Sequence, residues 1–135
     1  DLLSKLGLPV ERPYVEKTPV DMIVDGVVRV QNKTACKVAS QVGSFTVCVR
    51  RRAGRPYEKR DFDALAVIIV TDGILRGLFW FPMAECVNCG IIGGDLKGLT
   101  VYPPWSTLGF AKAQRAKAWQ SHFWVSGAGG TSDLS

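Results

Sequence analysis

The sequence has few of the residues and patterns that mark membrane, exported and metal-binding proteins. Only one of its 135 residues is histidine and four are cysteine, which excludes a metal site built from several imidazoles. No apolar run approaches the roughly 18 residues that a membrane-spanning helix needs. The first residues show no basic, apolar and small-residue pattern of a signal peptide. We therefore expect an intracellular protein with no membrane partner.

The four cysteines are Cys36, Cys48, Cys86 and Cys89. The "CVNC" pair has the spacing of a zinc knuckle, and Cys36 with Cys48 could supply two more thiolates. Against this, the first pair is separated by a long interval on expected strands. Reduced cysteines in the core or in loops are the favoured interpretation, because a domain of this size needs no disulfide.

The composition suits one domain with one core. Apolar residues make up 47% of the chain and aromatic residues 10%, which is enough apolar surface to bury and argues against disorder. We assign residues 1–125 to this domain. The remaining segment, 126–135, reads "SGAGGTSDLS". It has almost nothing to bury, so we expect a flexible tail.

The hydrophobic pattern predicts an α/β fold. Strands are expected in "TPVDMIVDGVVRVQNKTA" (18–35, a hairpin), "GSFTVCVR" (43–50), "FDALAVIIVTDG" (62–73, buried on both faces), "ILRGLFWFP" (74–82) and "GLTVYPP" (98–104, an edge strand). Asp72 and Gly73 predict a tight turn. Helices are expected at residues 1–7 and 106–124, the second capped by Ser106 or Thr107. Residues 83–94 are read as a glycine-rich connection. The result is a mixed sheet of about five strands flanked by helices.

Polar side chains interrupt the apolar hairpin at Asp21, Arg29, Gln31 and Lys33. Side chains alternate along a strand, so Arg29, Gln31 and Lys33 share one face. A strict two-residue turn would place Asp21 opposite Val30, on the wrong face. We predict one extra residue in the turn, which places Asp21 opposite Gln31. A carboxylate, an amide oxygen and an ammonium then converge, and such oxygen ligands suit Mg²⁺ and phosphate.

Positive charge is concentrated in one segment. The net charge is +5, which moderately favours a polyanionic partner. Six basic residues against one acid lie between residues 50 and 60, and clustered cations gain from counterion release on a nucleic acid backbone. The predicted nucleic-acid contacts are Arg29, Arg50, Arg51, Arg52, Arg55, Lys59 and Arg60.

The segments "VDMIVDG" and "VRVQNKTA" together resemble the core motif of the PD-(D/E)XK nuclease superfamily, which has Asp on one strand and Asp/Glu-x-Lys on the next. With Gln in place of the second acid, the sequence is most similar to group I intron-encoded homing endonucleases. The likeness continues through "YEKRDFDALAVII", "GLFWFPMAE" and "AKAWQ", and covers most of residues 1–125. It implies a restriction-endonuclease-like core.

The resemblance also implies the roles of individual residues. Asp21 would be the main Mg²⁺ ligand, joined by Gln31 and the carbonyl of Asn32. Lys33 would be the catalytic cation, completing a catalytic set of Asp21, Gln31 and Lys33. Another acid is expected, and the possible supporting acids are Asp1, Glu11, Asp61 and Asp63; the last two are read first as groups that anchor the loop.

These observations support three functions. The first is a Mg²⁺-dependent, site-specific endonuclease of double-stranded DNA, acting as a homodimer or homotetramer in the cytoplasm or a DNA-containing organelle. The second is a Holliday-junction resolvase of the same superfamily, which cuts branched DNA. The third is a catalytically degenerate nuclease fold that binds nucleic acid or serves as a structural subunit of a larger complex.

Overall fold

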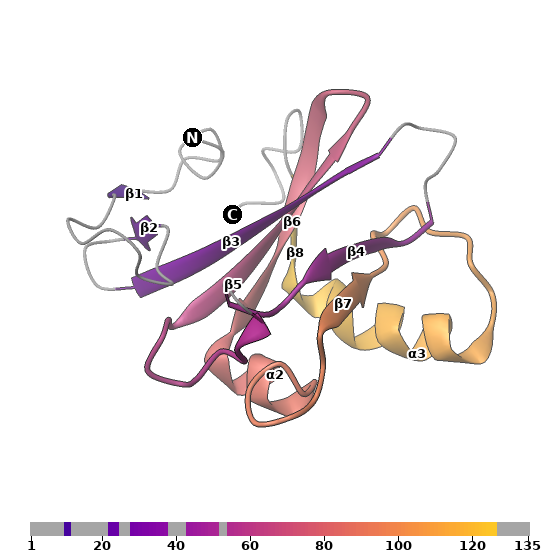
Figure 1. Ribbon diagram of the computed structural model, residues 1–135. Coiled ribbons are helices and arrows are strands. Elements are labelled where there is room, and N and C mark those ends of the chain that lie inside the picture. The colour runs from indigo at the N-terminus through magenta and orange to yellow at the C-terminus, as the bar shows by residue number, and fades with distance from the viewer. Residues whose placement is uncertain (1–9, 12–21, 25–27, 38–42, 52–53, 127–135) are drawn as a thin grey trace.

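The computed structural model describes residues 10–11, 22–24, 28–37, 43–51 and 54–126. The expected helix at 1–7 and tail residues 127–135 therefore lie outside the described residues. The elements in chain order are β1 (Val10–Glu11), β2 (Met22–Val24), β3 (Val28–Lys37), β4 (Phe45–Cys48), β5 (Ala64–Thr71), β6 (Ile74–Pro82), α2 (Met83–Asn88), β7 (Gly98–Val101), α3 (Ala111–Gln120), the short 3-10 helix η3 (Ser121–Phe123) and β8 (Trp124–Ser126) (Figure 1).

The main sheet is mixed and its strand order is β1-β2-β3-β5-β6-β8. Neighbouring strands are antiparallel except β3 and β5, which run parallel, with Val30 beside Ala64 and Lys37 beside Thr71. Parallel neighbours need a long crossover connection. Here the crossover spans residues 38–63 and carries β4 and the basic segment. The mixed α/β architecture expected from the sequence is confirmed, and within the described residues the main sheet has six strands in place of about five.

The strands β5 and β6 form the long hairpin that projects from the molecule in Figure 1. Thr71 pairs with Ile74, and Asp72 and Gly73 both have positive φ, 51° and 76°, as a two-residue hairpin turn requires. All but one of the residues of β5 are buried, as its continuous apolar run predicts. The sequence-based expectation for this hairpin is confirmed.

The strands expected at residues 43–50 and 98–104 do not join the main sheet. β4 alternates buried and exposed residues, as predicted, but pairs antiparallel with β7 in a separate two-stranded sheet, with Phe45 beside Val101. The side chains of Phe45 and Val101 are fully buried. Their apolar face covers the main sheet, so the two strands form part of a second layer.

The helices differ from the sequence-based expectation. The segment read as a connection contains α2, which begins after Pro82 and buries Cys86. The C-terminal helix begins at Ala111 rather than near residue 106, because Ser106 forms a turn with the carbonyl of Pro103 (2.9 Å) and Phe110 has extended backbone angles. It also ends earlier, and Trp124 starts β8 by pairing with Phe79 on β6.

The larger core lies between one face of the sheet and a layer made of α2, α3, β4 and β7 (Figure 1). The side chains of Leu65, Val67 and Phe81 line the sheet side of this core. Val30, Ala66, Ile68 and Leu78 are buried on the opposite face. Odd-numbered residues of β3 therefore face the larger core and the second layer, which sets the direction of Arg29, Gln31 and Lys33.

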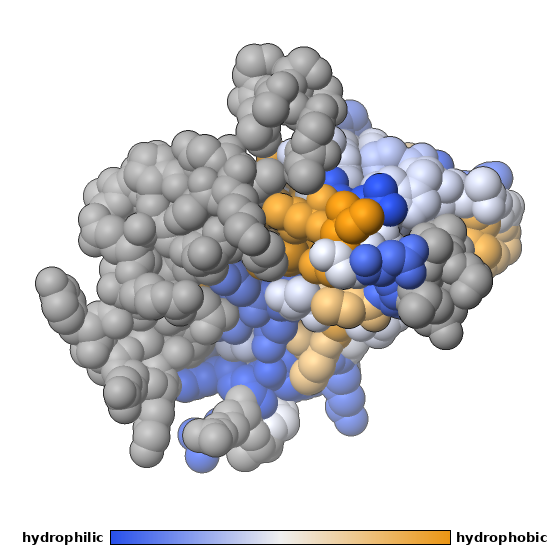
Figure 2. Space-filling model, turned by 90° about the horizontal axis from the view of Figure 1, so that it is seen from above, coloured by the Kyte–Doolittle hydropathy of each residue, from blue (hydrophilic) through white to orange (hydrophobic). Residues whose placement is uncertain are grey.

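No helix in the described part of the chain is long and apolar enough to cross a membrane. Seen from the side on which the β5–β6 hairpin projects, apolar side chains gather in a patch beside hydrophilic surface (Figure 2). Ile74, next to the hairpin turn, is one of the exposed large apolar residues.

Candidate functional site

The connection between β2 and β3 determines which side chains share a face. Val24 pairs with Val28 and Met22 with Val30, so residues 25–27 separate the last pair. This is one residue more than a strict two-residue turn, and the predicted extra residue is confirmed. Asp21 itself, the predicted main metal ligand, lies outside the described residues. Asp1 and Arg52 do as well, and the side chain of Glu11 is not described.

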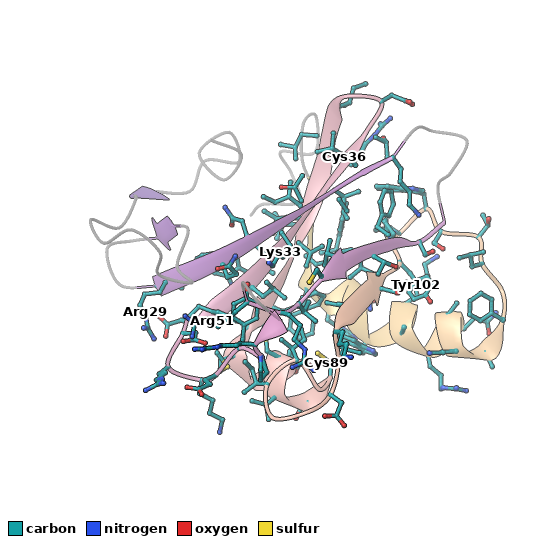
Figure 3. All side chains as sticks on the ribbon, in the orientation of Figure 1. Arg29, Lys33, Cys36, Arg51, Cys89 and Tyr102 are labelled. Atoms are coloured by element: carbon teal, nitrogen blue, oxygen red, sulfur yellow. The ribbon has the colours of Figure 1, made fainter. Side chains whose placement is uncertain are left out.

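Gln31, Asn32 and Lys33 lie in the middle of β3. The Gln31 side chain is buried, and its amide Nε2 donates to the carbonyl oxygen of Asn32 over 3.3 Å. Lys33 is half-buried and its Nζ lies 5.5 Å from the centre of the Tyr57 ring. A cation over an aromatic face is attracted by the ring quadrupole. Lys33 therefore lies on the face of β3 that points to the basic segment (Figure 3). The alternation of side chains along a strand puts Gln31 on the same face.

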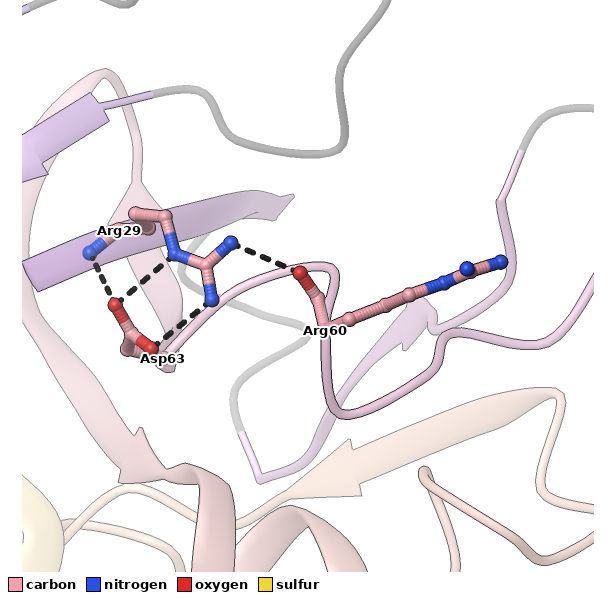
Figure 4. Close-up of polar contacts among 3 residues, drawn as sticks. All are labelled: Arg29, Arg60 and Asp63. Carbon is pink, nitrogen blue, oxygen red and sulfur yellow. Dashed lines mark hydrogen bonds and ion pairs between the residues drawn. The ribbon is translucent and has the colours of Figure 1, made fainter.

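Arg29, on the same face, is held by Asp63. The Asp63 carboxylate accepts hydrogen bonds from the backbone amide of Arg29 (2.9 Å), from its Nε (3.2 Å) and from its second terminal nitrogen (3.2 Å). The remaining terminal nitrogen donates to the carbonyl of Arg60 (2.8 Å; Figure 4). The hydrogen bond from Arg29 lowers the pKa of Asp63, and the same bond raises the pKa of Arg29. Both side chains thus join β3 to the entrance of β5.

The other acids of the crossover also hold the basic segment in place. Asp61 is buried, accepts a hydrogen bond from the backbone amide of Glu58 (2.8 Å) and pairs with Arg51 (3.5 Å). Glu58 pairs with Arg60 (2.7 Å) on the surface. The contacts of Asp61 and Asp63 are those of loop-anchoring groups.

The cations of the basic segment fall into two groups. Arg50 donates to the carbonyl of Asp95 (3.1 Å), and Arg51 and Arg60 are ion-paired. Arg55 and Lys59 are exposed, and neither side chain makes a hydrogen bond or ion pair with another described residue. These two are therefore the cations best placed to bind an external anion.

The cysteines do not form a common site. Cys36 lies near the upper end of β3 in Figure 3, whereas Cys89 lies beside α2. Burial raises the pKa of the Cys86 thiol to about 12, and burial also raises the pKa of Cys89. Both thiols are protonated at neutral pH, which disfavours metal binding.

The described residues supply only part of a metal centre. Within these ranges no group of three or more His, Cys, Asp or Glu residues could hold a metal ion. The side-chain oxygen of Gln31 and the carbonyl of Asn32 are hard oxygen donors, which fit Mg²⁺ better than a softer metal. A carboxylate is still needed to complete such a site.

Sequence reasoning missed two features of this region. Tyr57 is part of the "YEKRDFDALAVII" motif, which gives no sign that its ring lies beside Lys33. The "GIIGG" segment belongs to the expected connection, yet Ile92, Gly93 and Gly94 line a hollow next to Tyr57. Neither "PYEK" around Tyr57 nor "GIIGG" contains a local pattern that indicates which distant segment it meets.

Comparison with known proteins gives a consistent picture. The crystal structure of MepB is 22% identical in sequence and similar with a TM-score of 0.64, over 88% of this chain and 84% of that chain. The structure of a bacterial homing endonuclease, I-Ssp6803I, is 20% identical with a TM-score of 0.55, over 89% of this chain and 82% of that chain. Both likenesses show a shared fold. No curated protein matches the sequence. The family model described as MepB-like matches residues 14–126, and the chain therefore belongs to the MepB-like family.

Proposed function

We propose that the protein is a Mg²⁺-dependent DNA endonuclease of the PD-(D/E)XK type, with Asp21, Gln31 and Lys33 as its catalytic residues. The observation that carries this proposal is the pairing of β2 with β3. Met22 lies opposite Val30, and continuing the same ladder by one pair would set Asp21 opposite Gln31. Directly opposite residues on antiparallel strands project to the same side. The fold shared with a homing endonuclease supports the same assignment.

The oxygen donors on this face suit a metal of the Mg²⁺ class. Asp21, Gln31 and the Asn32 carbonyl would hold it, and the bound ion would polarise a phosphate and lower the pKa of a water. Gln31 is neutral, so the site carries less negative charge than a pair of carboxylates and should bind the metal more weakly.

Lys33 has a separate part in the proposed reaction. Its ammonium would stabilise the negative charge that develops on the phosphate oxygens in the transition state. The half-buried position beside Tyr57 limits the motion of this side chain. A cation that is already in position loses little free energy to reorganisation during the reaction, so the Tyr57 contact favours such a role.

The basic segment would hold the DNA backbone. Arg55 and Lys59 are exposed and lie on the connection that precedes β5, on the side of the sheet reached by Lys33. Phosphate contacts of this type position the duplex without reading its sequence. Cutting both strands at one site is simplest with two symmetric active sites, so we propose a homodimer or a homotetramer.

A second function is nucleic-acid binding without cleavage. The observation that favours it is the state of the nearby acids: Asp61 and Asp63 are engaged by Arg51 and Arg29. Without another carboxylate, the metal affinity of the site would depend on Asp21 alone. The protein would then keep the fold and the basic surface and would hold DNA within a larger complex.

The test is cleavage of supercoiled, linear and four-way-junction DNA with and without Mg²⁺. Lys33→Ala should abolish cutting and leave DNA binding nearly unchanged, because the loss concerns the transition state. Lys37→Ala is the matched control: Lys37 lies on the same face of β3, over the ring of Phe45 at 4.9 Å. If the Lys33→Ala variant cut DNA as fast as the wild type, the proposed catalytic role of this site would be wrong. Preference for the junction would favour a resolvase, and salt-sensitive binding without any cutting would favour the second function.

A further inference from the structure

A hollow of about 470 Å³ lies between the basic segment and the turn that follows α2. Residues 56–59 form one side and residues 92–94 form the other. The two segments are far apart in sequence. Arg50, which forms a β-bridge with Pro56, donates to the carbonyl of Asp95 and so links the chain beside each segment. Its volume lies within the range of small-ligand sites, roughly 300–1,000 Å³.

The lining has an apolar floor and a charged rim. Tyr57 is 4% exposed and Ile92 is 7% exposed, so each shows only a small apolar surface to the hollow. The Tyr57 ring is fixed edge-on against Phe62, with ring centres 5.2 Å apart. At the rim, the Glu58 carboxylate is paired with Arg60 (2.7 Å), which leaves the Lys59 ammonium as the available charge. The matching ligand has a flat, weakly polar part and an anionic group.

Two of the residues that line the hollow, Gly93 and Gly94, have no side chain. A Cβ atom at Gly93 would meet no other heavy atom within 4 Å, so this position opens into free space. A Cβ atom at Gly94 would lie 2.7 Å from the carbonyl oxygen of Gly90, so that position tolerates no side chain. Gly93 and Gly94 therefore line the hollow with backbone alone.

The hollow adjoins the proposed catalytic cation. Tyr57 lines it and also lies 5.5 Å from the Nζ of Lys33. A ligand in the hollow would therefore lie next to the place where a phosphate meets Lys33.

We propose that this hollow binds one nucleotide of the DNA, with its base against Tyr57 and Ile92 and its phosphate at Lys59. This inference rests on the proposed function, since it takes the bound polymer to be nucleic acid. Contact between a base and an aromatic side chain is tolerant of sequence, and the exposed edges of Tyr57 and Ile92 offer the base such a contact. A base reaches such a pocket most easily from unpaired or distorted DNA.

The test is nucleotide binding without metal, followed by NMR of the ¹⁵N-labelled protein. Thymidine 5′-monophosphate should shift the amide signals of residues 57–59 and 92–94. It should bind at least fivefold more tightly than deoxyribose 5-phosphate, because the base contributes to affinity. Lys59→Ala should weaken the nucleotide by roughly fivefold through loss of a charged contact. Lys112→Ala, an exposed lysine on α3, removes the same charge elsewhere and should leave the affinity unchanged.

A second variant tests the shape of the hollow. Gly93 has φ +77°, a conformation that strains any side chain but that asparagine tolerates better than most residues, so Gly93→Asn is the substitution that narrows the hollow at the smallest cost in stability. It should weaken the nucleotide at least fivefold and lower the thermal unfolding temperature only slightly. Equal affinity for deoxyribose 5-phosphate, or shifts confined to other residues, or no effect of either variant would overturn the proposal. The nucleotide-binding test uses no metal and measures no cleavage. Its outcome is therefore independent of the cleavage assay that tests the proposed function.

Discussion

Arg29 and Asp63 are joined by three hydrogen bonds at the point where β3 and β5 begin to run side by side. One of them comes from the backbone amide of Arg29, and the amide of Asp63 in turn donates to the carbonyl of Arg29 (2.8 Å). Asp63→Asn should lower the free energy of unfolding by about 1 kcal/mol, because both side chains are more than one-third exposed and solvent screens the pair.

The same pair predicts a pH dependence. Arg29 lowers the pKa of Asp63 below its usual value of 3.8, so the stabilisation is present above about pH 4 and is lost as the pH falls through the lowered pKa. The free energy of unfolding, measured in urea at about pH 7 and about pH 3, should change less between these pH values for Asp63→Asn than for the wild type. Glu58→Gln, in the exposed pair with Arg60, is the control and should change stability little. An unaltered acid dependence in the Asp63 variant would contradict this account.

The basic segment should contribute unequally to DNA affinity. Arg55→Ala should reduce the slope of log affinity against log salt by about 0.9, because one phosphate contact is lost. Arg51→Ala should have a smaller effect on the slope, since Arg51 is paired with Asp61. Fluorescence anisotropy with one duplex at several salt concentrations measures both. Arg76→Ala, an exposed position on β6, controls for net charge. An equal change in the salt slope for all three variants would argue against a localised DNA-binding surface.

Gln120 connects α3 to β7 and the residue that follows it. Its side-chain oxygen accepts from the amide of Tyr102 (2.8 Å), and its nitrogen donates to the carbonyl of Thr100 (3.0 Å). Gln120 is only 1% exposed, so Gln120→Leu removes a buried hydrogen bond from each of the two backbone groups and should cost about 2–4 kcal/mol. Gln114→Leu, exposed on the same helix, should change stability by less than about 0.5 kcal/mol. Urea unfolding of the two variants provides the comparison.

Gly77 allows β8 to pair with β6. It has φ +153°, and a Cβ atom there would lie 2.3 Å from the carbonyl oxygen of Val125 and 2.7 Å from the Trp124 ring. Gly77→Ala should therefore detach β8 and lower the unfolding free energy by more than about 3 kcal/mol. Hydrogen exchange should show faster exchange in residues 124–126. At Gly98 the nearest contact of a Cβ atom is the Thr46 methyl at 3.4 Å, and Gly98→Ala should cost much less.

The thiols should differ in their reactivity with iodoacetamide. Cys36 and Cys48 are exposed, whereas Cys86 is fully buried and its pKa is raised to about 12. At about pH 8, peptide mass spectrometry should find Cys36 and Cys48 labelled first and Cys86 last, because the thiolate is the nucleophile. Denaturant should remove the difference. Early labelling of Cys86 in the native protein would show that α2 opens readily.

Local patterns predicted those parts of the fold that depend on neighbouring residues. The Asp72–Gly73 turn and the doubly buried strand β5 follow from glycine conformation and from an unbroken apolar run. The extra residue in the 25–27 connection followed from the requirement that polar side chains share a face. In each case the structure is determined by residues close together in the chain, so it can be predicted from the sequence.

Other features depend on contacts between distant segments. Phe45 alternates like any half-buried strand residue, and nothing local reveals that its strand pairs with β7 instead of the main sheet. The end of α3 depends on the packing of Trp124 against Phe79, with ring centres 4.9 Å apart, which overrides the helical spacing of residues 106–124. Likewise, the Arg29–Asp63 contact follows only once β3 and β5 are known to be parallel neighbours.

The crossover between β3 and β5 has a consequence for engineering. It leaves the sheet after Lys37 and returns at Asp63, where Arg29 fixes its end. Extending a flexible loop costs little, about 0.6 kcal/mol for each doubling of its length. The part between Arg51 and Pro56 could therefore be exchanged for a segment of different length and charge, while Tyr57 stays buried against Phe62 and both central strands keep their pairing. Chimeras made at these two positions would separate the choice of ligand from the stability of the scaffold.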